Sequence, residues 1–235
     1  WTLASRSTFT GPTTVRAGTL RLAHAEALAA SGGVTVAGGR LALPGDVPLA
    51  VTLRGLTIDE TAGLVDLGRG RLTVTGGITA STLRADLAAG RNDGGWDGAT
   101  GIVSSAAAAD VAAGTPRAVG WLDHGDGRFS IAYAALGDCN IDGVVDVLDA
   151  ANFLADGLFD SGLDAVWSQG DFTGDGWLDI LDAAAFVSTG LFDLGAYVDP
   201  GGPAAVPPAA VPEPEAVAWL AILAAAAAAR VRGRR

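Results

Sequence analysis

A twelve-residue pattern of oxygen-bearing side chains occurs twice in this chain and constrains it more than any other feature. One copy begins at Asp138 and the other at Asp171, 33 residues later. In each copy, oxygen-bearing side chains stand at positions 1, 3, 5, 9 and 12, and glycine stands at position 6. A loop that turns sharply at position 6 can gather these oxygens around Ca²⁺, which takes about six to eight oxygen ligands. The sequence therefore predicts two calcium sites.

The two predicted sites differ at position 3. Thr173 of the second loop is a poorer oxygen donor than Asn140 of the first, so we expect the second site to be the weaker one. Position 7 would contribute its backbone carbonyl, which leaves its side chain free to vary. The predicted ligands are Asp138, Asn140, Asp142, Val144, Asp146 and Asp149 in the first loop, and Asp171, Thr173, Asp175, Trp177, Asp179 and Asp182 in the second.

The charge of the chain is concentrated around these loops. Residues 137–200 contain 13 Asp and no Arg, Lys or Glu, whereas residues 1–136 contain 11 Arg and 11 acidic residues. Such a density of negative charge repels itself unless a cation neutralises it. Because no basic stripe exists before the last six residues, nucleic-acid binding is not expected.

The duplication continues beyond the loops. Residues 144–162 and 177–195 share 11 identities in 19 positions. Each loop is therefore expected to run into a short helix, which Gly157 or Gly190 ends. Ser161, with an acidic residue three positions later, resembles a capping box and predicts a third short helix that reaches Ser168.

With these features, the segment resembles a type I dockerin, a family built from two loop–helix halves with aspartate at position 12. The resemblance implies two bound calcium ions and docking into a cohesin receptor, often in polysaccharide-degrading assemblies. Positions 10 and 11 often carry small hydroxyl residues in that family, but here they are Val147-Leu148 and Ile180-Leu181. The cohesin partner therefore carries over less well than calcium, and we expect each apolar pair to pack against the other half.

Before this segment, residues 1–75 show short alternating apolar segments between glycines and turns. Such short segments predict strands in either a coiled β-solenoid or a small antiparallel sheet, and periodicity alone does not decide between them. The predicted strands are residues 18–22, 33–36, 39–43, 50–53, 56–59 and 71–74.

The opening stretch adds a second resemblance. Trp1-Thr-Leu3, the segment from Ser7 to Val15, and Ala17-Gly-Thr-Leu-Arg-Leu22 resemble the autotransporter-associated β-strand repeat, with Phe9 where that family usually has tyrosine. The resemblance implies a parallel β-helical stalk of a secreted protein, whose core is buried by stacking of repeats.

Two further elements are predicted before the acidic segment. Residues 80–90 read as a helix with Ser81 as its N-cap and Gly90 at its end. Residues 117–135 read as a β-hairpin around a glycine-rich turn that contains His124. We expect residues 80–135 to close the β-domain.

The C-terminal end resembles a PEP-CTERM sorting signal. Val211-Pro-Glu-Pro214 precedes an apolar run, Ala216–Ala229, and a basic end. The resemblance implies export, transient membrane retention through the apolar run, and processing near the motif. A plain tail anchor and a disordered alanine tract are the alternatives.

The remaining residues suggest no catalytic site. Neither histidine has partners that indicate a metal or a triad, and no feature selects a pair of carboxylates. The single cysteine, Cys139, is expected to be a free thiol at an exposed loop position. The chain contains no Met, so we expect it to be part of a longer protein, and any catalytic domain would precede Trp1.

The sequence thus predicts a mixed, multi-domain fold. An all-β, solenoid-like domain with a terminal hairpin spans residues 1–136, and a small all-α, dockerin-like calcium domain spans 137–195. A Pro/Gly/Ala linker (196–210) and a hydrophobic helix within the sorting segment (211–235) follow.

The predicted function is a non-enzymatic calcium-binding docking or adhesion module of a secreted, surface-associated bacterial repeat protein of the planctomycete type. Its partner would be a cohesin-like domain or a surface polymer. One alternative is the attachment end of a secreted polysaccharide-degrading enzyme, and another is calcium used for structure alone.

Overall fold

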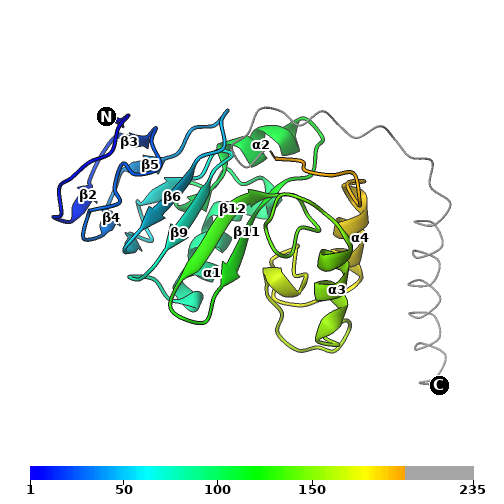
Figure 1. Ribbon diagram of the computed structural model, residues 1–235. Helices are drawn as coiled ribbons and strands as arrows, with labels where there is room; N and C mark the ends of the chain where they lie inside the picture. The colour runs from blue at the N-terminus through cyan, green and yellow to red at the C-terminus, as the bar shows by residue number, and fades with distance from the viewer. Residues whose placement is uncertain (199–235) are drawn as a thin grey trace, which may run out of the picture. The chain divides into compact units, whose positions relative to one another are not determined.

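In this computed structural model, which describes residues 1–198, the short strands between Thr2 and Ala134 form three sheets (Figure 1). The first sheet has the order β1 (Thr2–Leu3), β3 (Thr19–Leu22), β5 (Arg40–Ala42), β8 (Leu64–Asp66) and β10 (Gly101–Val103). The second has the order β2 (Thr13–Val15), β4 (Val34–Val36) and β7 (Leu56–Ile58). The third has the order β11 (Ala118–Asp123), β12 (Phe129–Ala134), β9 (Arg71–Val74) and β6 (Ala50–Leu53).

The strand pairing is that of a parallel β-solenoid. Thr13 pairs with Val34, and Val34 pairs with Leu56, in parallel register. Up to β9, one coil therefore takes 19 to 24 residues across the three sheets. The six predicted strands are all present. Strands β1 to β10 pair with one another in parallel, so the fold is the predicted solenoid and not the antiparallel sheet.

Inward-facing apolar side chains form ladders that hold the coil together. In the first sheet, Leu41, Val65 and Ile102 are paired neighbours and are fully buried. In the third sheet, Leu72 of β9 is paired with Val51 of β6 on one side and with Ile131 of β12 on the other, and all three are buried. Each coil therefore buries its apolar face only against the next, as expected for a stacked repeat.

Helix α1 (Ala80–Arg91) and the β11–β12 hairpin follow the coil, as predicted, but the helix ends differ from the prediction. The N-cap is Thr79, whose side chain accepts a hydrogen bond from the Thr82 amide, and not Ser81. The helix continues past Gly90 to Arg91. It ends there because the next residue, Asn92, adopts the left-handed conformation, at φ 42°. A short 3₁₀ turn, η1 (Asn92–Gly94), comes next, and helix α2 (Ser105–Ala112), which was not predicted, follows β10.

The acidic segment contains the two predicted helices, α3 (Val147–Ala155) and α4 (Ile180–Ser188). The prediction of a helix from Ser161 to Ser168 is wrong. The Ser161 hydroxyl accepts from the amide of Leu163, two residues on, and Gly162 adopts φ 73°, so the chain turns there. Only the 3₁₀ turn η2 (Trp167–Gln169) forms at the end of this stretch.

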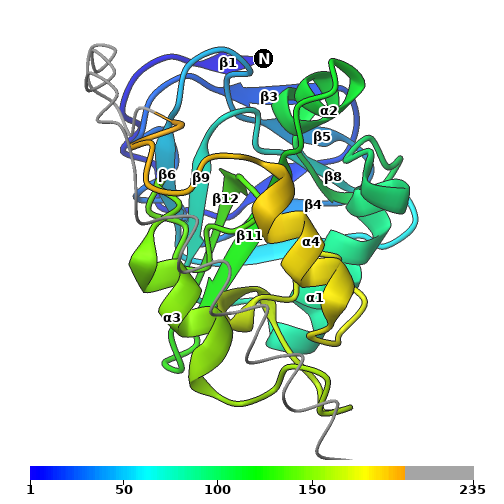
Figure 2. The ribbon, with the colours of Figure 1, turned by 90° about the vertical axis from the view of Figure 1, so that its right-hand side faces the viewer.

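The acidic segment packs directly on the β-solenoid. Trp167 is buried in the same apolar core as strands β9, β11 and β12, and a Cβ atom on Gly120 of β11 would lie 2.6 Å from its ring. Figure 2 shows α3 and α4 in front of this sheet. Residues 1–198 lie within one compact unit, so the domain boundary at residue 136 stays a prediction.

No helix within residues 1–198 is long and apolar enough to cross a membrane. The predicted sorting segment, 211–235, and most of the predicted linker lie outside the described residues.

Candidate functional site

The two acidic loops fold in the same way. Their position-6 glycines, Gly143 and Gly176, have φ values of 90° and 91°. Position 4 is also left-handed in both, at Ile141 (φ 49°) and Gly174 (φ 69°). Positive φ is strained for a β-branched residue such as isoleucine, so the loop and its contacts enforce this turn.

The first aspartate of each loop is buried and turned inward. Asp138 is fully buried and Asp171 is 6% exposed. The Oδ2 atom of each accepts a hydrogen bond from the amide of the position-6 glycine at 3.0 Å. The sharp turn at position 6 thus folds back onto position 1, as the sequence spacing predicts.

The aspartate at position 12 closes each loop from its other end. Asp149 accepts hydrogen bonds from the amides of Cys139, Asn140 and Asp146 at 2.8, 3.3 and 2.9 Å. Asp182 accepts the three equivalent bonds at 3.0, 2.9 and 3.0 Å. Both carboxylates are fully buried, so each loop has two buried acidic groups that face its interior.

The position-9 aspartates link the loops to their helices. Asp146 is the N-cap of α3, and Asp179 is the N-cap of α4. Each side chain accepts from the amide two residues on at 2.7 Å, which satisfies a free donor of the first helical turn. Loop closure and helix initiation therefore depend on the same residues.

The remaining predicted ligands lie along the two loops. Asn140 and Asp142 each accept from a nearby loop amide, at 2.8 and 2.9 Å. Thr173 differs, because its buried hydroxyl oxygen has no hydrogen-bond partner among the described residues. The position-7 residues, Val144 and Trp177, point no oxygen-bearing side chain into the loop, and Trp177 is 46% exposed.

Burial and mutual repulsion raise the pKa values of the buried loop carboxylates. Burial, helped by the charges of Asp149 and Asp142 and opposed by the hydrogen bonds that Asp138 accepts, raises the pKa of Asp138 to about 7. Burial, with the charge of Asp182, raises the pKa of Asp171 to about 6. The carboxylates at positions 1, 5 and 12 therefore lie close enough to repel one another, although none forms an ion pair within residues 1–198.

Acidic side chains alone do not complete a metal centre in either loop. In the described part of the chain, no group of three or more His, Cys, Asp and Glu side chains is gathered closely enough to hold a metal ion. The predicted ligand sets also use an amide or hydroxyl oxygen and a backbone carbonyl. The available donors are all oxygens and the Thr173 hydroxyl is unpaired, a set that suits Ca²⁺ better than a transition metal.

Basic residues that are distant in sequence reach both loops. Arg71 of β9 donates a hydrogen bond to the backbone oxygen of Ile141. The guanidinium groups of Arg84 and Arg91 on α1 lie beside the second loop, 3.1 and 3.5 Å from Cβ positions built on Gly176 and Gly174. The acidic segment has no basic residue of its own, so these neighbours could not be predicted from its sequence.

Tyr197 belongs to the first site and was missed. Its hydroxyl donates to Asp138 Oδ2 at 2.5 Å, and its amide donates to the Gly143 oxygen at 2.9 Å. The predicted linker began at residue 196, so it includes this residue. No local pattern marks Tyr197, because its role depends on the chain returning to a loop about 60 residues earlier.

The apolar pairs at positions 10 and 11 do not pack against the other half, which corrects the expectation. Val147 and Leu148 are 68% and 59% exposed, and Ile180 and Leu181 are 69% and 58% exposed. Position 8 supplies the buried apolar residue of each half instead. The position-8 residues are Val145 and Leu178.

The predicted exposure of Cys139 is also wrong. The thiol is fully buried in the shared core, and burial raises its pKa above the ordinary range. It lies at position 2 of the first loop, where its amide binds Asp149, so the side chain faces the core while the backbone faces the loop.

No protein-family model, curated protein or solved structure matches this chain. The functional argument therefore rests on the geometry of the two loops and on the surfaces beside them.

Proposed function

We propose that residues 138–193 bind two calcium ions and form a dockerin-like docking module. One observation carries the proposal: the two loops have the same backbone turns and the same hydrogen-bond pattern around buried acidic groups. A single acidic loop could adopt such a shape by chance. Two copies that keep positions 1, 6, 9 and 12 in the same roles are better explained by a shared ligand.

The chemistry of the loops fits this ligand. Buried carboxylates without ion-pair partners cost free energy unless a cation neutralises them. Calcium would supply that charge, and the Thr173 hydroxyl oxygen would be one of its ligands in the second loop. The first-loop residues from Asp138 to Asp149 would hold one ion, and the second-loop residues from Asp171 to Asp182 the other.

The docking role is supported by the exposed apolar pairs. Val147-Leu148 and Ile180-Leu181 occupy equivalent places at the starts of α3 and α4, and exposed Leu154 and Val187 lie further along the same helices. Exposed apolar groups that recur on a duplicated scaffold are typical of a protein-binding surface. The proposed partner is a protein domain with an apolar face, and the resemblance of the C-terminal end to a sorting signal supports a location of both partners outside the cell.

Calcium titration of the full chain by calorimetry tests the metal sites. We expect two binding events, with the tighter one at the first loop. Asp171→Ala should abolish one event and leave the other, because its carboxylate is central to the second loop only. Asp164→Asn, in the exposed stretch between the loops, is the control and should retain both. The absence of any calcium heat, or equal loss in both variants, would overturn the proposal.

Capture of secreted proteins on the immobilised chain tests docking. Replacing Val147 and Leu148 by serine should reduce a calcium-dependent capture, and replacing Ile180 and Leu181 should do the same. Leu163→Ser is the control, because this residue is equally exposed but lies between the two halves. Capture that is unaffected by both double variants would contradict docking through these pairs and leave the calcium sites standing.

A further inference from the structure

A cavity lies where the end of the β-solenoid meets the second acidic loop. Its volume is about 350 Å³, and its lining comes from α1, from the segment between α2 and β11, and from the acidic segment. Gly114, which lines it, is exposed, so the cavity reaches the surface. A volume above about 300 Å³ is in the range of small-molecule sites.

The lining combines two cationic groups with aromatic and apolar ones. Arg91 and Arg117 line the cavity together with Trp96, Phe172 and Leu136, and no acidic residue lines it. The chain has a formal net charge of −11, yet this cavity is lined by two arginines and by no carboxylate. The cavity therefore suits a ligand with a negative charge and an apolar face.

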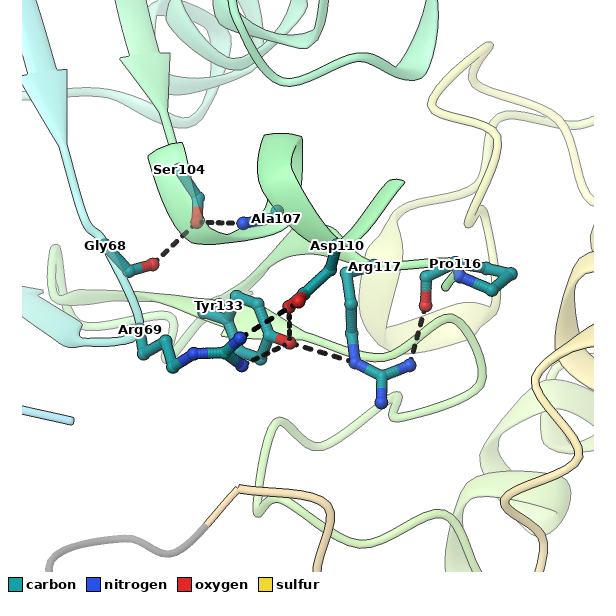
Figure 3. A network of polar contacts seen from close by, with 8 residues as sticks. All are labelled: Gly68, Arg69, Ser104, Ala107, Asp110, Pro116, Arg117 and Tyr133. Carbon is teal, nitrogen blue, oxygen red and sulfur yellow. Dashed lines mark hydrogen bonds and ion pairs between the residues drawn. The ribbon is translucent and has the colours of Figure 1, made fainter. Parts of the chain in front are cut away.

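Arg117 is held in place without using all of its donors. Its Nε donates to the Tyr133 hydroxyl at 3.0 Å, and its Nη1 donates to the Pro116 oxygen at 2.8 Å (Figure 3). The other terminal nitrogen has no contact with the residues drawn there. Tyr133 is in turn fixed by Arg69 and Asp110, which pair with each other at 2.9 Å, so the charge of Asp110 is already matched.

Arg91 offers its whole guanidinium group. It forms no side-chain hydrogen bond and no ion pair with another residue between 1 and 198, although it is only partly exposed. An arginine in that state can bind a carboxylate through two parallel hydrogen bonds.

Trp96 is placed beside this arginine by a strained turn. It adopts φ 54°, after Asn92 and Asp93, which also have positive φ, and its amide donates to the Arg91 oxygen at 2.9 Å. A left-handed conformation is rare for a bulky aromatic residue, and such strain concentrates at ligand sites. The turn fixes the indole ring, which is 5% exposed, in the cavity wall.

We propose that this cavity binds a small organic acid, with its carboxylate on Arg91 and Arg117 and its apolar face against Trp96 and Phe172. An acidic sugar and an aromatic acid share this chemistry, and a binding experiment separates them. The site is distinct from the proposed calcium loops, although Phe172 and Thr173 of the second loop contribute to its wall.

Calorimetric titration of the full chain, in excess calcium, with galacturonate and with benzoate tests the proposal. Galactose and benzamide are the matched uncharged probes. We expect at least one acid to bind and its neutral counterpart to bind at least ~10-fold more weakly, because a hydrogen bond to a charged group has about that effect. Failure of both acids to bind, or equal binding of acid and neutral probe, would overturn the proposal.

Variants locate the site. Arg91→Ala and Arg117→Ala should each weaken binding by ~10-fold or more. Arg84→Ala is the control, because Arg84 lies on the same helix but does not line the cavity. Arg117→Ala also removes the hydrogen bond to Tyr133 and the stacking of the guanidinium group on the Tyr197 ring. The Arg91 side chain makes no hydrogen bond or ion pair within residues 1–198, so Arg91→Ala with an unchanged melting temperature is the decisive variant. Full affinity in that variant, or an equal loss in Arg84→Ala, would refute the site.

Discussion

Asp86 on α1 is a buried carboxylate that the fold tolerates at a cost. It is 3% exposed, and its Oδ2 atom has no hydrogen-bond partner within the described residues. Burial, and then the nearby charge of Glu60, raise the pKa of Asp86 to about 6. Because the unfolded chain releases this proton at lower pH than the folded chain does, the contribution of Asp86 to stability falls as the pH rises from about 4 to about 6.

Asp86→Asn should therefore stabilise the protein at neutral pH. The gain over the natural chain should be near zero at about pH 4 and should reach about 3 kcal/mol at pH 7, since the pKa rises from 3.8 to about 6 and one pKa unit corresponds to about 1.4 kcal/mol. Urea unfolding at several pH values in excess calcium measures this difference. Asp93→Asn, at an exposed site two residues past the helix, should show no such trend. A gain that is independent of pH would mean that the Asp86 carboxylate is not the cause.

The first turn of α1 shows how one side chain fixes the start of an element. The Thr79 hydroxyl oxygen accepts from the Thr82 amide at 3.2 Å, whereas Ser81 lies inside the helix. Thr79→Ala should reduce the free energy of unfolding by about 1 kcal/mol, the usual effect of losing an N-cap. Ser81→Ala, measured in the same thermal denaturation experiment, should change it by much less. Equal losses in the two variants would contradict this assignment of the cap.

At the scale of elements, the sequence correctly predicted the strands and helix starts that depend only on neighbouring residues. The six alternating segments in residues 18–74 form strands, and the loop spacing fixes where α3 and α4 begin, because Asp146 and Asp179 serve as caps. Helix α2 was missed because its alanine run has no apolar periodicity to mark it. The predicted N-cap was Ser81 and not Thr79, because several hydroxyl residues stand close together there.

Pairing and long-range contact could not be predicted in the same way. The choice between solenoid and antiparallel sheet depends on which strands meet, such as Thr13 with Val34, and a period-2 pattern is the same in both. Tyr197 reaches Asp138 only because the chain returns to the first loop. The exposure of Val147 and Ile180 depends on which face of each helix packs against the solenoid, and the composition of the pair carries no information on that.

At the scale of the whole molecule, Gly120 marks a close contact between the solenoid and the acidic segment. A Cβ atom there would lie 2.6 Å from the Trp167 ring and 2.7 Å from Ile141. Gly120→Ala should therefore destabilise the protein by about 1 to 3 kcal/mol through overpacking. Gly11→Ala, where a Cβ atom would meet nothing within 4 Å, is the control for thermal unfolding. A neutral effect at Gly120 would indicate that this contact is loose in solution.

The same contact connects the two acidic loops, the proposed calcium sites, to the solenoid. The indole N–H of Trp167 donates to the Asp138 backbone oxygen at 2.7 Å, and the buried Cys139 lies in the shared core. When the first loop is ordered, the side chains that cover one face of the third sheet are therefore ordered too. If calcium binds only the folded chain, each site at a thousandfold excess over its Kd adds about 4 kcal/mol to the free energy of unfolding.

Removal of calcium should consequently lower the melting temperature of the whole described region as one cooperative unit. Differential scanning calorimetry with excess calcium and with excess chelator measures this effect. We expect a single transition that moves to lower temperature in chelator, because the loops cannot unfold without exposing Trp167 and the sheet beneath it. Two separate transitions, of which only one responds to calcium, would show that the acidic segment and the solenoid are thermodynamically independent. In that case the shared core would contribute too little free energy to couple them, and the predicted boundary at residue 136 would be a true domain boundary.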